Sequence, residues 1–138
     1  MVTDQTTNQP DPTTPEEQVV VERLPFGATQ ANLRVRQIAD RETPAIAAQL
    51  KEAITDLNST DRFFVIRLEE VQFMNSMGLG MLINLRNRLH ERGCQTILIG
   101  VSDHLKSLLD LVRASRLFRV ADDDASVKAI VRGGSDPE

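Results

Sequence analysis

The sequence contains no tryptophan and no tyrosine, and aromatic residues make up only 4% of its 138 residues. The core must therefore be aliphatic, and a surface that stacks nucleic-acid bases on aromatic rings is disfavoured. The net charge of −4 adds no general attraction to phosphate backbones or anionic lipid. We therefore expect no nucleic acid among the partners.

Cysteine and long apolar runs are also scarce. Cys94 is the only cysteine, so an internal disulfide and zinc sites built on several cysteines are excluded. Its place at the head of an apolar run favours a small buried side chain over a reactive thiol. No run approaches the roughly 20 apolar residues of a membrane helix, and the N-terminus has no signal-peptide pattern. The sequence predicts a cytoplasmic protein without direct membrane insertion.

The length of the chain fits one domain with its own core. Residues 1–16 are polar and rich in proline and threonine, which predicts a disordered N-terminal tail, because little apolar surface offsets the entropy of ordering. Residues 17–132 carry the patterns of a folded domain. Residues 133–138 read as a frayed C-terminus.

Apolar periodicity predicts the order β-β-α-β-α-β-α-β-α. The expected strands are 17–24, 31–38, 62–68, 94–101 and 116–120, and the expected helices start near residues 43, 76, 102 and 122. The first two strands would form a hairpin, and the later strand–helix–strand units would make parallel pairs with right-handed crossovers. This order predicts an α/β fold, with a mixed β-sheet of about four to five strands layered with about four helices.

Several residues are expected to end or cap these helices. Thr43 reads as an N-cap, with Pro44 at the first helical position, where its missing N–H is not needed. Ser102 reads as the cap of the third helix, and Gly93 as a left-handed stop after the second.

Catalytic readings of the sequence fail on spacing. His90 and His104 have no second ligand at metal-binding spacing, so both are expected to be solvated or capping residues. Ser76 lies at a strand-to-helix turn, and a nucleophile elbow requires glycines on both sides of it, at positions 74 and 78. Gly78 is present, but Met74 stands at the other position, so the motif is absent. We therefore expect no enzymatic activity, no metal and no cofactor.

Phosphate-binding readings of the same turn also fail. A dinucleotide fingerprint starting at Gly78 and Gly80 requires a third glycine where Ile83 stands, and no Gly-Lys-Ser/Thr run exists. The two glycines are better explained by a tight turn and close contact between helix and sheet. Met77 and Leu79 make this turn more apolar than a loop requires, which leaves a docking surface as the remaining interpretation.

Residues 71–120 resemble the STAS domain of the bacterial anti-sigma factor antagonists. The family signature is a strand, a loop reading Asp-Ser-Ser/Thr-Gly-Leu-Gly and an amphipathic helix, and residues 75–80 match that loop without a gap. The likeness covers 17–132 in element order and is specific in 62–120. The resemblance implies a single STAS-like domain.

The resemblance also implies a function. Members of the family bind, through this loop and the adjoining helix, an anti-sigma factor that is also a serine kinase. ATP is bound by that partner and not by the antagonist, which is not an enzyme. The partner-binding residues implied here are Met74, Asn75, Ser76, Met77, Gly78, Leu79, Gly80 and Met81.

The chain departs from the family motif at two positions. Asn75 replaces the aspartate, and the resemblance puts the phosphoacceptor position at Met77, which has no hydroxyl. Ser76 is read either as a helix cap, which is favoured, or as a phosphosite. Docking without the usual switch is therefore expected. The alternative is a structural STAS subunit of a larger assembly, such as a stressosome-like scaffold or a transporter accessory protein, and a homo-oligomer is left open.

Overall fold

The computed structural model describes residues 18–133. The predicted tail at 1–16 and all but the first residue of the predicted frayed C-terminus lie outside this range. The strands are β1 (Val19–Leu24), β2 (Ala28–Leu33), β3 (Gln37–Ile38), β4 (Phe63–Arg67), β5 (Phe73–Met74), β6 (Gln95–Ile99) and β7 (Arg119–Ala121). The helices are α2 (Thr43–Thr55), α3 (Ser76–Glu91), α4 (Asp103–Leu111), a short 3-10 helix (Ser115–Leu117) and α5 (Asp124–Gly133).

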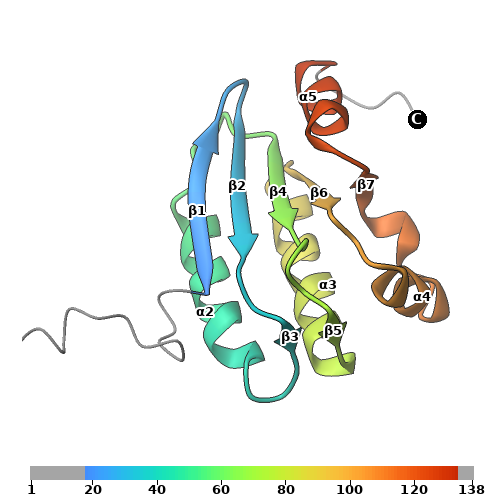
Figure 1. The fold of residues 1–138 in the computed structure, drawn as a ribbon. Helices are drawn as coiled ribbons and strands as arrows, with labels where there is room; N and C mark the ends of the chain where they lie inside the picture. The colour runs from blue at the N-terminus through green and yellow to red at the C-terminus, as the bar shows by residue number, and fades with distance from the viewer. Residues whose placement is uncertain (1–17, 134–138) are drawn as a thin grey trace, which may run out of the picture.

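Five of the strands form one mixed sheet in the order β1-β2-β4-β6-β7 (Figure 1). β1 and β2 pair antiparallel as a hairpin, and every other pair in this sheet is parallel. The predicted α/β fold with a mixed sheet and four helices is confirmed. Among the helices of residues 18–133, none combines the length and the apolar content that a membrane span requires.

The sheet carries a core on each face. The larger core joins α2, α3 and α4 to one face, and the smaller joins α5 to the other. Figure 1 shows α2 and α3 behind the sheet and α5 at its upper right. β4 contributes Phe64 and Ile66 to the larger core and Phe63 and Val65 to the smaller, as expected for a strand buried on both faces.

The second predicted strand, 31–38, is wrong in its bounds. Phe26 and Gly27 both have positive φ, at 64° and 73°, and turn the chain so tightly that pairing with β1 resumes at Ala28. The strand ends at Leu33, and the residues that follow leave the main sheet. Gln37 and Ile38 form a separate two-stranded parallel sheet with β5, which no sequence pattern predicts.

The predicted cap at Thr43 is also wrong. Thr43 is the first residue of α2, and Glu42 takes the N-cap position without a side-chain bond to the helix. The Thr43 hydroxyl instead donates to the carbonyl of Ala39 at 2.7 Å, while the Glu42 carboxylate accepts from the Ala39 N–H. The caps at Ser102 and Gly93 are confirmed, since Ser102 Oγ accepts from Leu105 N–H and Gly93 has a φ of 76°.

Cys94 lies in the larger core with 3% of its surface exposed. Desolvation by burial, reinforced by the charge of Asp61, raises the pKa of the thiol to about 11, and Arg92 partly opposes the shift. The thiol is therefore protonated at neutral pH, and the prediction of a small buried side chain is confirmed.

Candidate partner-binding site

The turn before α3 is held in place by the chain segment that follows β2. The N–H groups of Gln72 and Phe73 both donate to the carbonyl of Arg36, at 2.7 and 3.1 Å. The N–H of Asn75 donates to the carbonyl of Ile38 at 3.2 Å, and β5 pairs with β3 between these bonds. Sequence reasoning missed this support, because two-residue strands carry no periodic signal.

Asn75 is the N-cap of α3. Its backbone is extended, and Oδ1 accepts from the N–H groups of Met77 and Gly78 at 3.1 Å each. The amide nitrogen Nδ2 donates to Oδ1 of Asp40 at 2.9 Å. An aspartate at position 75 could accept the same two cap bonds but could not donate to Asp40. It would instead place a second negative charge beside the Asp40 carboxylate, so the amide of Asn75 suits both the helix and Asp40.

The prediction that the Ser76 hydroxyl caps the helix is therefore wrong. Ser76 is the first residue of α3, one position too late to cap it, and its side chain is exposed. The hydroxyl makes no hydrogen bond to any residue in the part of the chain that the structure describes.

The two glycines of this turn have different roles. A Cβ at Gly78 would lie 2.5 Å from the carbonyl oxygen of Ile38 and 2.8 Å from Cγ of Met74, so α3 approaches β3 too closely for any side chain. A Cβ at Gly80 would meet nothing within 4 Å. Close helix–sheet contact, expected of both glycines, is found only at Gly78.

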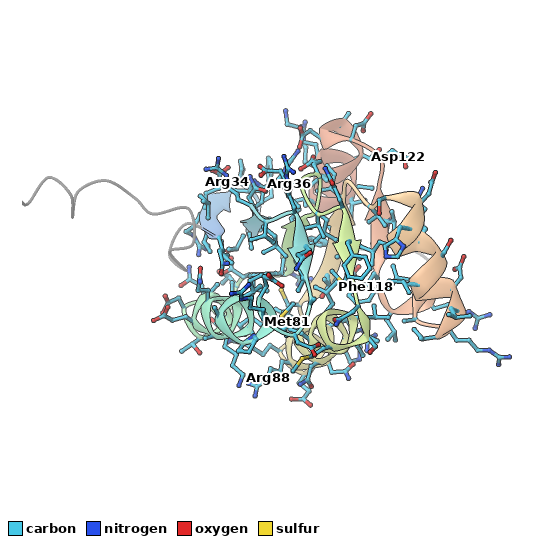
Figure 2. All side chains as sticks on the ribbon, turned by 60° about the horizontal axis from the view of Figure 1, so that its bottom comes forward. Arg34, Arg36, Met81, Arg88, Phe118 and Asp122 are labelled. Carbon is cyan, nitrogen blue, oxygen red and sulfur yellow. The ribbon has the colours of Figure 1, made fainter. Side chains whose placement is uncertain are left out.

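The eight predicted partner-binding residues do not share one surface. Met74, Leu79 and Met81 belong to the larger core, and Figure 2 shows Met81 between α2 and α3. Their side chains cannot contact a partner directly, which corrects that part of the prediction. The residues that do reach the surface are Ser76, Met77 and Gly80, with Asn75 half-buried and Gly78 buried.

Two residues outside the predicted set extend this surface. Phe73 is 45% exposed, close to the 48% of Met77, because β5 alternates and Met74 points inward. The ring of His104, from the first turn of α4, stacks on Phe73 with 5.4 Å between centroids and 20° between planes. His104 was expected to be solvated or capping. Phe73 could have been identified from the sequence, because side chains alternate between the two faces of a strand and the strand before Asn75 buries Met74. We call Phe73, Ser76, Met77, Gly80 and His104 the docking surface.

Comparison with solved structures gives the same fold at low sequence identity. The phosphorylated form of SpoIIAA, a Bacillus cell fate determinant, is 16% identical, with 81% of this chain and 98% of that chain covered and a TM-score of 0.62. An anti-sigma factor antagonist from Mycobacterium paratuberculosis is 18% identical, with coverages of 83% and 92% and a TM-score of 0.70. A sulfate transporter family protein from Wolinella succinogenes is 21% identical, with coverages of 89% and 96% and a TM-score of 0.67.

The comparison with protein families gives a family assignment. The STAS domain family matches residues 43–127, which is more than half of the chain and includes the whole of α3 and its preceding turn. The chain belongs to the STAS domain family.

Proposed function

We propose that this protein is an anti-sigma factor antagonist that binds an anti-sigma factor of the serine-kinase type through the docking surface. The observation that carries the proposal is the pair of exposed apolar side chains, Phe73 and Met77, beside an exposed serine at a rigidly held helix start. The similarity to solved anti-sigma factor antagonists supports it. In this proposal the protein acts in the cytoplasm, performs no catalysis and binds no ATP itself.

The docking surface has the physical properties of a contact site. Phe73 and Met77 each leave nearly half of their side chain in water, and burying them against a partner recovers free energy. Methionine adapts its shape to a partner, and the neighbouring Gly80 lets a partner's backbone approach the helix. The bonds to Arg36, Ile38 and Asp40 hold this surface in place, so that little entropy is lost on binding.

In this proposal the regulatory phosphate is added to the exposed hydroxyl of Ser76. It is not added at position 77, where the family motif has its phosphoacceptor and this chain has methionine. Asn75 takes over the cap, which leaves the Ser76 oxygen exposed and accessible to a kinase. A phosphate there brings nearly two negative charges between two apolar contact residues and so opposes docking. The helix N-terminus tolerates that charge, so the fold survives. SpoIIAA, which has the same fold, is known in a phosphorylated form.

The test is an affinity capture from lysate of the source cells, with the wild-type chain and Met77→Asp as baits. We expect the wild type to retain an ATP-binding serine kinase together with a sigma factor, and Met77→Asp to lose both. The recovered kinase, given ATP, should add one phosphate to the wild type and none to Ser76→Ala, as measured by intact mass. Capture of neither protein by the wild type would refute the proposal.

The second candidate is a structural subunit of a larger assembly, such as a transporter or a stressosome-like scaffold. The similarity to a sulfate transporter family protein favours it, since that similarity covers 89% of this chain, compared with 83% for the antagonist from Mycobacterium paratuberculosis. In that case the same capture would recover transport or scaffold subunits without a kinase. Light scattering on the purified chain decides whether a homo-oligomer forms.

A further inference from the structure

A cavity of about 330 Å³ lies at the C-terminal half of α3, at the opposite end of the helix from the docking surface. Its wall is formed by α3, the start of β6 and the segment that leads into β7. Figure 2 shows Phe118, one of the wall residues, beside α3. The polar groups of the wall are Arg86, His90, Gln95, Thr96, Arg116 and Arg119.

Three arginines are among the residues that form the wall. Arg86, Arg116 and Arg119 come from α3, the 3-10 helix and β7, and no aspartate or glutamate is among the described wall residues. Cys94 adds no negative charge, because burial raises the pKa of its thiol to about 11. This group of arginines lies in a chain whose net charge is −4, and grouped positive charge favours anions at the wall.

Two wall residues have geometry suited to holding a ligand. The Arg86 guanidinium is fixed by Nε, which donates to the carbonyl of Leu117 at 3.1 Å, and by Nη1, which donates to Asn87 Oδ1 at 3.1 Å. Thr96 is only 3% exposed, and its hydroxyl has no hydrogen-bond partner in residues 18–133. A buried hydroxyl without a partner is costly, and a ligand oxygen would supply one.

The negative end of the α3 dipole does not account for these arginines. The dipole acts within the last turn of a helix, where Arg88 and His90 lie. Arg86 precedes that turn, and Arg116 and Arg119 belong to a segment more than 20 residues further along the chain. Three separate elements therefore bring guanidinium groups to one cavity that contains a buried unpaired hydroxyl.

We propose that this cavity is a binding site for a small phosphate-bearing anion, either free phosphate or a small phosphomonoester. Guanidinium groups bind phosphate oxygens through paired, charge-assisted hydrogen bonds. The volume is at the lower end of the range of ligand pockets, about 300–1,000 Å³, which suits a phosphate with few further atoms. The site is separate from the docking surface and does not depend on the proposed partner.

The test is a titration of the full chain, followed by ¹H–¹⁵N NMR, with inorganic phosphate, glycerol 3-phosphate and a chloride control at equal ionic strength. We expect saturable shifts at Thr96 and Arg116 with phosphate and none with chloride, and the amide of Met77 should not respond. Tighter binding of glycerol 3-phosphate would identify a phosphomonoester, and equal or weaker binding would identify free phosphate.

Variants make the result specific to the cavity. Arg116 is exposed and makes no hydrogen bond with the described residues, so Arg116→Gln keeps the fold and should weaken phosphate binding about tenfold. Arg88→Gln removes the same charge from the outer side of α3, outside the cavity, and should change affinity less than about twofold (Figure 2). The proposal would be overturned if both variants weakened binding equally or if the shifts did not saturate. Either result would show that phosphate binds as an adventitious ion only.

Discussion

The two ends of α3 differ in how they are built. The N-terminal end is closely packed, with Gly78 against Ile38 and the cap residue Asn75 bonded to Asp40, and the exposed side chains of its first turn, Ser76 and Met77, are uncharged. The C-terminal end borders an open cavity lined by arginines. One helix thus presents a rigid apolar surface and an electropositive cavity.

The distance between the ends lets them act independently. A 16-residue helix is roughly 24 Å long at about 1.5 Å per residue. Charges are screened over about 8 Å at physiological ionic strength, so an anion at one end has little effect on contacts at the other. The close packing at the N-terminal end also makes its substitutions more damaging, and the predictions below begin there.

The largest effect is expected from Gly78→Val. Its side chain would collide with the carbonyl of Ile38 in the core, and we expect a loss of about 3 kcal/mol in the free energy of unfolding. Gly80→Val, two residues further on, has open space and should leave stability nearly unchanged or slightly raised. Urea denaturation of both variants measures the difference. Equal stabilities would refute the close approach of α3 to β3.

The next largest effect concerns docking. Met77→Asp places a carboxylate within the docking surface, where a partner would desolvate it without a counter-charge. We expect a loss of about 2 kcal/mol in binding free energy, roughly a 30-fold weaker affinity. Asn84→Asp adds the same charge at an exposed position of α3 outside this surface and should have little effect. Calorimetric titration against the captured partner compares the two, and similar losses would place the interface elsewhere.

A smaller effect tests the pair formed by Asn75 and Asp40. Asn75→Asp keeps the cap but replaces a hydrogen bond with two facing carboxylates, and should cost about 1 kcal/mol of stability at neutral pH. The double variant Asn75→Asp with Asp40→Asn reverses the roles and should recover most of that loss. Thermal unfolding of the two single variants and the double variant gives the coupling energy. A coupling near zero would mean that the bond does not stabilise the turn.

These residues also show where sequence reasoning succeeds and where it fails. The buried faces of α2 and α3 follow from apolar periodicity, because one periodic segment determines one helix face. The roles of Asn75 and Gly78 could not be predicted, since their partners Asp40 and Ile38 lie 35 or more residues away in the sequence. Met81 lies four residues before Leu85 on the buried face of α3, so the same periodicity predicts its burial, and only the resemblance to a binding loop suggested an exposed contact.

The smallest effect is expected from Ser76→Ala, and it decides between the two readings of this serine. If Ser76 capped α3, alanine would cost about 1 kcal/mol, as expected for the N-cap variant Asn75→Ala. Its hydroxyl makes no hydrogen bond to the described residues, so we expect a change within about 0.5 kcal/mol for Ser76→Ala. Urea denaturation of both alanine variants provides the measurement. Equal losses would show that the two residues share the cap, and Ser76 would then be less free to accept a phosphate.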